Sequence, residues 1–187
     1  PLGQFLERAR KGMPVKASPR RNLTYGDLLT FAHSNPTSFD VAEVNLLCAR
    51  GLPGVGDLRI PECLDIIDKW SDRVRDETQR RHAEYRQSPE RFANSEARFR
   101  LSVLADVLRN DAGLYYDYPP LLRQPTADTN QPQRNLFQDP RNLFIHGVLL
   151  KQTPPTSITL TVIVAALGRR QGYPLKLATA KTHGIVR

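Results

Sequence analysis

The stretch TPPTSITLTVIVAALGRRQGYPLKLATAKTHGIVR, residues 153–187, decides the fold predicted for this chain. Its centre, Ile158 to Leu167, is apolar around the whole circumference of a helix, which is typical of a helix buried on all sides. Gly172 ends this helix, and the segments PLKLATA and HGIVR that follow indicate two short strands joined by a tight turn. Because two strands alone form a marginal sheet, we expect the sheet to continue beyond Arg187.

The first half of the chain is predicted to be helical. A long helix begins near Pro61, which fits a first helical turn because its missing N–H costs nothing there. Its apolar residues recur at helical spacing on one side: Leu64, Ile67, Trp70 and Val74. Shorter helices are expected after Thr24 and after Asp40, which is placed to cap its helix, and another ends before Gly113. The predicted fold class is therefore α+β, predominantly α-helical, with a helical N-terminal half before a core that combines a buried helix and a small C-terminal β-sheet.

Composition divides the chain into four parts. Residues 1–22 are expected to form a basic, flexible arm, and residues 23–114 a helical subdomain. Residues 115–141 contain five prolines among many polar residues, which predicts a long irregular loop. Residues 142–187 form the predicted C-terminal core.

The formal net charge of +8 and a pI near 9.9 are compatible with binding to nucleic acid or to an acidic partner. The basic residues are spread along the chain, however, and only residues 8–21 form a dense basic patch, which a solvated arm explains as well. No apolar run is long enough to cross a bilayer, and no signal segment opens the sequence. We therefore expect a cytoplasmic protein without a membrane partner.

Cysteine and histidine give no sign of a metal centre. Cys48 and Cys63 lack the spacing of metal ligands and fall on apolar helix positions, where a free cysteine acts as a small hydrophobic residue. The four histidines are scattered along the chain. Neither a metal, a disulfide nor a cofactor is expected.

Four segments, taken in their order, resemble a bacterial branch of the transglutaminase-like superfamily that has a helical N-terminal half. They are DVAEVNLLCARGLP (40–53), CLDIIDKWSDRVR (63–75), DPRNLFIHGVLLKQ (139–152) and GRRQGYPLKLATAKTHGIVR (168–187). The resemblance implies a papain-like arrangement, in which a nucleophilic cysteine opens a central helix and a histidine on a following strand serves as its base. It implies that Ser157 takes the place of the cysteine and that His183 takes the place of the histidine. Thr156, Asn142 and His146 would line the same cleft.

The chain departs from the catalytic members of this superfamily at the turn before the buried helix. They carry a GTC-x-S-type turn where this chain has Pro155 to Thr159, and the same branch often lacks the cysteine. A thiol at a helix N-terminus gains from the helix dipole and from a nearby imidazolium, whereas a serine hydroxyl needs a base poised to take its proton. Only four residues follow His183, so the orienting aspartate of the family has no counterpart in this sequence.

Each candidate residue has a simpler explanation. Ser157, or its neighbour Thr156, fits a helix cap, because the side-chain oxygen of serine or threonine accepts an N–H of the first turn. His183 fits a histidine at the turn between two strands, and His146 a histidine on a helix face. The cap is favoured over the nucleophile.

The function predicted first is a transglutaminase-like domain without catalytic activity that binds a protein or a peptide. The alternative is an acyl-transfer or amide-hydrolysing enzyme with Ser157 as nucleophile and His183 as base. A second alternative, from charge alone, is a nucleic-acid-binding module that uses the basic arm.

Overall fold

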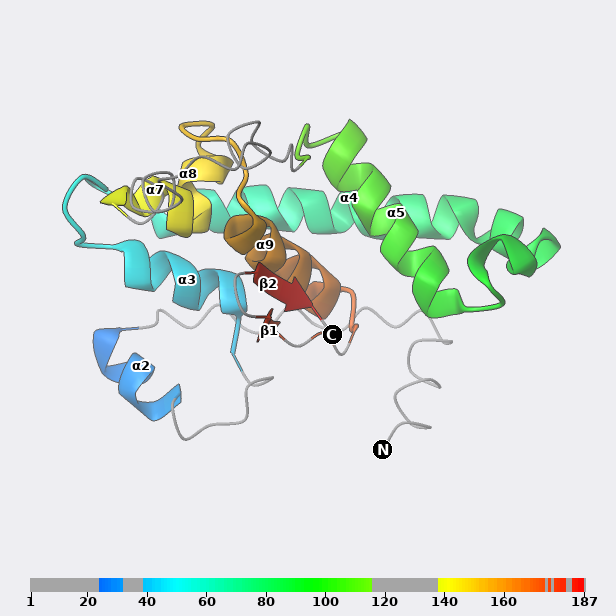
Figure 1. Ribbon diagram of the computed structural model, residues 1–187, viewed down its shortest axis with the longest axis horizontal. Coiled ribbons are helices and arrows are strands. Elements are labelled where there is room, and N and C mark those ends of the chain that lie inside the picture. The colour runs from blue at the N-terminus through cyan, green and yellow to red at the C-terminus, as the bar shows by residue number, and fades with distance from the viewer. Residues whose placement is uncertain are drawn as a thin grey trace, which may run out of the picture.

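The computed structural model describes residues 24–31, 39–115, 138–173, 175, 177–180 and 183–186. Figure 1 shows its elements in chain order. They are α2 (Tyr25–Phe31), α3 (Val41–Ala49), α4 (Ile60–Gln87), the 3₁₀ helix η1 (Pro89–Phe92), α5 (Glu96–Asn110), α7 (Pro140–Leu143), α8 (Ile145–Leu149), α9 (Ser157–Arg170), β1 (Leu177–Ala180) and β2 (His183–Val186). The predicted basic arm and most of the predicted irregular loop lie outside the described residues.

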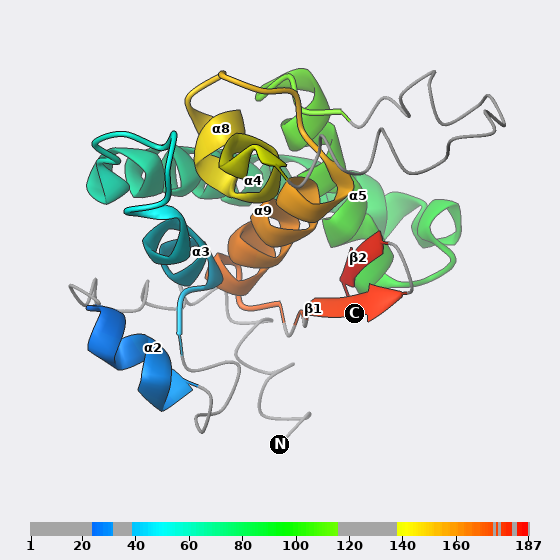
Figure 2. The same cartoon turned by 60° about the vertical axis from the view of Figure 1, so that its left-hand side comes forward.

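Helix α9 forms the centre of the molecule, with α3, α4, α5 and α8 packed around it (Figures 1 and 2). Its side chains are buried on several faces, as the apolar composition of this segment predicts. The buried residues are Thr159, Val162, Ile163, Ala165, Ala166, Leu167 and Gly168. Burying apolar surface on several sides of one helix fixes its position among its neighbours.

Helix α4 is the longest element, with 28 residues, and it begins with Pro61 in its first turn as predicted. It ends before Ser88 and Pro89, and the chain then reverses through Ala93 and Asn94, which both have positive φ. Ser95 caps α5 by accepting a hydrogen bond from a first-turn N–H. Where the two helices meet, the ring of Phe99 lies 5.2 Å from the rings of both Tyr85 and Phe92. This aromatic contact holds α5 across α4.

One hydrophobic core joins the two halves of the chain. It contains Leu46 of α3, Ile67 of α4 and Leu104 of α5 from the first half. Ile145 of α8 and Ile163 of α9 come from the second half and belong to the same cluster. The described helices therefore pack as one unit around α9.

The predicted α+β fold class is wrong, because about 70% of the interpretable part of the chain is helical. β structure in the described residues is limited to one antiparallel pair, in which Leu177 lies opposite Val186 and Ala180 opposite His183. This pair of four-residue strands is a ribbon at the side of α9, and within the described residues no further strand joins it. The reason lies in the number and length of the strands: two strands of four residues form only a ribbon against α9, and helices make up the other neighbours of α9 in the described residues.

Within the described ranges, no helix combines the length and the apolar character that a membrane span requires.

Candidate functional site

The turn before α9 brings together two of the residues predicted to line a site. Thr156 is the N-cap of α9, and its hydroxyl donates to the backbone carbonyl of Asn142 at 3.0 Å. This bond ties the start of α9 to α7, which lies 14 residues earlier in the chain. Asn142 thus contributes a backbone oxygen to the turn.

The hydroxyls of Thr156 and Thr159 form a reciprocal capping box. The Thr156 hydroxyl accepts from the backbone N–H of Thr159 at 3.2 Å, and the Thr159 hydroxyl accepts from the backbone N–H of Thr156 at 2.9 Å. Each hydroxyl also donates its single proton to a backbone carbonyl, that of Asn142 for Thr156 and that of Thr156 for Thr159. The proton and one lone pair of each hydroxyl are therefore engaged in local structure.

Ser157 is the first residue of α9, one position after the cap. Its backbone carbonyl accepts from the Thr161 hydroxyl at 2.5 Å, and its side chain is half-buried. Among the side chains that the structure describes, no imidazole or carboxylate hydrogen-bonds to the Ser157 hydroxyl. A helix cap at this turn is confirmed, and the residue that provides it is Thr156.

His183 is the first residue of β2, where its backbone pairs with Ala180. Its side chain lies outside the described residues. The strand β2 runs alongside α9, and in Figures 1 and 2 the arrow begins toward the amino-terminal end of that helix. The backbone thus places the predicted base and the predicted nucleophile on neighbouring elements.

His146 lies in the short helix α8 and is 1% exposed. Neither ring nitrogen has a hydrogen-bond partner within the part of the chain that the structure describes. Burial lowers the pKa of the imidazole; nearby Asp139 opposes this effect and Arg141 adds to it. His146 is therefore a neutral core residue at physiological pH. It lies on a helix, as predicted, but the helix face that carries it points into the core.

Several residues that support the turn were not predicted. Asn45 of α3 accepts a hydrogen bond from the backbone N–H of Ile145 at 2.9 Å, which fixes the start of α8. The Thr153 hydroxyl donates to the carbonyl of Arg141 at 2.9 Å. Thr153 also donates its backbone N–H to the carbonyl of Gly147, as does Gln152. No local sequence signal marks these contacts, because each joins residues that are distant in the chain or depends on the exact path of the loop.

Ion pairs and hydrogen bonds fix the C-terminal end of α9. Arg170 donates to Asp40 at 2.5 Å and to Asp68 at 2.9 Å, so that its guanidinium joins α3 and α4. Beside it, the Gln171 side chain donates to the hydroxyl and the carbonyl of Ser71. Asp40 was identified from the sequence only as the cap of α3, a role that the structure confirms.

The remaining reactive groups lie away from the turn. Burial raises the pKa of the Cys63 thiol to about 11, and partial burial also raises the pKa of the Cys48 thiol. In the described ranges, no three His, Cys, Asp or Glu residues gather as a metal site would require. A shallow cavity of about 340 Å³ lies at the start of α4, lined by Arg50 and residues 57–62. None of the candidate residues lines this cavity.

No protein-family model, curated protein or solved structure matches this chain. The resemblance to transglutaminase-like proteins therefore stays a prediction from the order of sequence segments.

Proposed function

We propose that this chain is a transglutaminase-like protein without hydrolase chemistry that works by binding a protein or peptide partner. The observation that carries the proposal is the use of hydroxyls at the turn before α9. Thr156 and Thr159 are committed to the capping box and to Asn142. The hydroxyl that caps α9 is thus held by backbone groups, whereas a serine nucleophile needs a general base within hydrogen-bond reach.

The loop between α8 and α9 supports the binding part of the proposal. Its backbone is held by hydrogen bonds from Gln152 and Thr153 to the carbonyl of Gly147, and by the Thr153 hydroxyl on Arg141. A loop fixed in this way loses little conformational entropy when it binds. We define the binding loop as residues 150–155.

The exposed side chains of the binding loop suit a protein partner. Leu150 is 41% exposed, and Lys151, Gln152 and Pro154 are exposed around it. Lys151 has a φ of 56°, a conformation that a non-glycine residue adopts only where its surroundings impose it. An apolar side chain surrounded by hydrogen-bonding groups resembles the centre and rim of a small protein interface.

The first experiment tests for catalytic geometry. Ser157 is replaced by cysteine in a background in which Cys48 and Cys63 are alanine, and the alkylation rate is followed against pH, with and without His183→Ala. We expect a thiol pKa near the ordinary value of about 8.5 that His183→Ala leaves unchanged. Lys151→Cys in the same background gives the reference for an exposed thiol. A strongly lowered pKa that rises when His183 is removed would favour the enzyme instead.

The second experiment tests the binding loop. A displayed peptide library is panned on the wild-type chain, and the enriched peptides are measured on Leu150→Gln and Leu101→Gln. Leu101 on α5 is 40% exposed and serves as a matched control for Leu150. We expect Leu150→Gln to weaken binding at least tenfold and Leu101→Gln to leave it unchanged. Equal effects of the two substitutions, or no enriched peptide, would contradict binding through this loop.

A further inference from the structure

The helix α8 has only five residues, and all five are buried: Ile145, His146, Gly147, Val148 and Leu149. It packs against α3, α4, α7 and α9. Its start is held by Asn45, and the Gly147 carbonyl accepts from Gln152 at 2.8 Å. So short a helix is not stable by itself, and its structure depends on this packing.

The imidazole of His146 is a polar group without a partner in this packing. It is 1% exposed, and among the described residues neither of its nitrogens has a hydrogen-bond partner. A buried polar group without partners destabilises the folded state, and a buried charge does so much more strongly. Adding a proton to His146 would place an unsolvated cation inside the core.

The surroundings offer little to balance such a charge. On α7, the Asp139 carboxylate is already paired with Arg141 at 2.6 Å, and these two residues act on the imidazole in opposite directions. On α3, the side chain that contacts the start of α8 is the neutral amide of Asn45. The buried titratable group of α4 is the Cys63 thiol, which is neutral at physiological pH because its pKa is raised to about 11.

The helix α9 adds no compensating charge either. It contains no acidic residue, and its two basic residues, Arg169 and Arg170, lie in its last turn. Of the titratable groups on α3, Glu43 lies in its first turn and is half-buried, and the thiol of Cys48 is exposed.

We propose that His146 is a proton-sensitive latch: the neutral imidazole lets α8 stay packed in the core, and its protonation releases α7, α8 and the binding loop from the bundle. This inference concerns the stability of the fold, and it holds whether or not the binding loop has a partner. If the binding loop does bind a peptide, acidification removes the binding surface as well.

The sign of the effect follows from proton binding. In the unfolded chain the imidazole takes up a proton as the pH falls below about 6.5, whereas in the folded chain burial lowers its pKa, so it stays neutral to lower pH. The unfolded state therefore binds more protons in this window, and stability falls with falling pH. The folding equilibrium constant decreases by up to about tenfold per pH unit below 6.5, until His146 titrates in the folded state.

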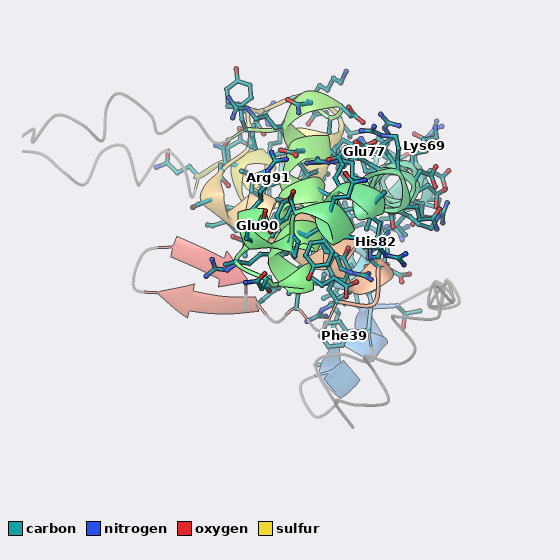
Figure 3. All side chains as sticks on the ribbon, turned by 90° about the vertical axis from the view of Figure 1, so that its right-hand side faces the viewer. Phe39, Lys69, Glu77, His82, Glu90 and Arg91 are labelled. Atoms are coloured by element: carbon teal, nitrogen blue, oxygen red, sulfur yellow. The ribbon has the colours of Figure 1, made fainter. Side chains whose placement is uncertain are left out.

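The test is denaturant unfolding of the full chain at pH 7.5, 6.5, 5.5 and 5.0. It compares the wild type with His146→Phe, which keeps an aromatic ring and removes the titration. The control is His82→Phe. His82 lies on α4 near its junction with α5, with its ring 6.1 Å from that of Phe99 (Figure 3). Between pH 6.5 and 5.5 we expect the folding constant of the wild type and of His82→Phe to fall about fivefold more than that of His146→Phe.

A second measurement keeps the proposal testable if His146→Phe does not fold. Hydrogen exchange of the wild type, corrected for the intrinsic pH dependence of exchange, is followed at residues 139–155 and in α5. We expect protection of residues 139–155 to fall at pH 5.5 while α5 stays protected. Parallel pH dependence in wild type and His146→Phe, or unchanged protection of residues 139–155, would overturn the proposal.

Discussion

Arg170, in the last turn of α9, pairs with Asp40, the residue that caps α3, with 2.5 Å between the guanidinium Nη2 and Oδ2 of the carboxylate. The same carboxylate accepts from the backbone N–H of Ala42 at 2.9 Å through its Oδ1 atom. Arg170 also reaches Asp68 of α4. One aspartate therefore both caps α3 and pairs with the arginine that also joins α9 to α4.

This double role of Asp40 predicts a graded loss of stability. Asp40→Asn keeps a good helix cap but removes the charge, and we expect the free energy of unfolding to fall by about 1 kcal/mol. Asp40→Ala removes both roles, so a fall of about 2–3 kcal/mol is expected. Denaturant unfolding at neutral pH measures both values.

The control for this series is Asp72→Ala, because Asp72 pairs with Arg75 at 2.8 Å on the exposed surface of α4. Exposed pairs contribute little, so a change within about 0.5 kcal/mol is expected. If Asp40→Ala cost no more than Asp72→Ala, the ion pair and the cap would not matter to stability.

From the geometry of the turn before α9, we expect substitutions at the cap residue Thr156 and at its neighbour Ser157 to change stability by different amounts. Thr156→Val removes the hydroxyl that bonds to both Thr159 and Asn142, and we expect it to lower the free energy of unfolding by about 1–2 kcal/mol. Thr156→Ser keeps the hydroxyl and restores most of this loss. Ser157→Ala, the matched control, changes it by about 0.5 kcal/mol or less. A larger cost for Ser157→Ala than for Thr156→Val would show that the hydroxyl of Ser157 has a role that the turn geometry does not explain.

Two glycines with close contacts make a third test. A Cβ atom at Gly147 would lie 2.1 Å from the backbone oxygen of Arg141, which α7 holds in place. Alanine is favoured over glycine in a helix by about 1 kcal/mol, but overpacking against backbone costs more, so Gly147→Ala should destabilise by about 2 kcal/mol or more.

At Gly168 the nearest atom to an added Cβ is Cδ1 of Leu175, at 2.2 Å. Leu175 can change its side-chain conformation, so helix propensity offsets part of the crowding, and we expect Gly168→Ala to cost less than about 1 kcal/mol. Thermal or denaturant unfolding of Gly147→Ala and Gly168→Ala measures which substitution destabilises the chain more. The reverse order would mean that α7 yields more easily than the Leu175 side chain.

Helices were predicted well because their signals are local. The apolar circumference of α9, the spacing of Leu64 and Ile67 on α4, and the cap at Asp40 all appear within a few residues of sequence.

The predictions that failed concern features that depend on contacts between residues far apart in the sequence. Residues 175–186 carry strand-like composition, but composition cannot tell whether any apolar surface of α9 is left for a sheet to cover. Thr156 and Ser157 are both good caps, and the choice between them is linked to a hydrogen bond to Asn142. The burial of His146 is invisible in sequence, because α8 is fixed by Asn45 a hundred positions earlier.

The two cysteines provide the last prediction, on the reactivity of thiols in the folded chain. Cys63 is 0% exposed with its pKa raised to about 11, so at pH 8 only about one molecule in a thousand carries the reactive thiolate there. Cys48 is exposed, and its thiol remains accessible although partial burial raises its pKa. With a colorimetric disulfide reagent at pH 8, we expect one thiol to react promptly in the native chain and both to react in denaturant.

In Cys48→Ala the prompt reaction should disappear, and the remaining thiol should react at a rate that follows unfolding of the core around α4. Cys63→Ala should keep the prompt reaction, with a loss of stability from the small cavity that the substitution leaves. Two promptly reacting thiols in the native wild type would show that Cys63 is accessible. The packing of α4 against α3 and α9 would then be looser than the burial of Cys63 indicates.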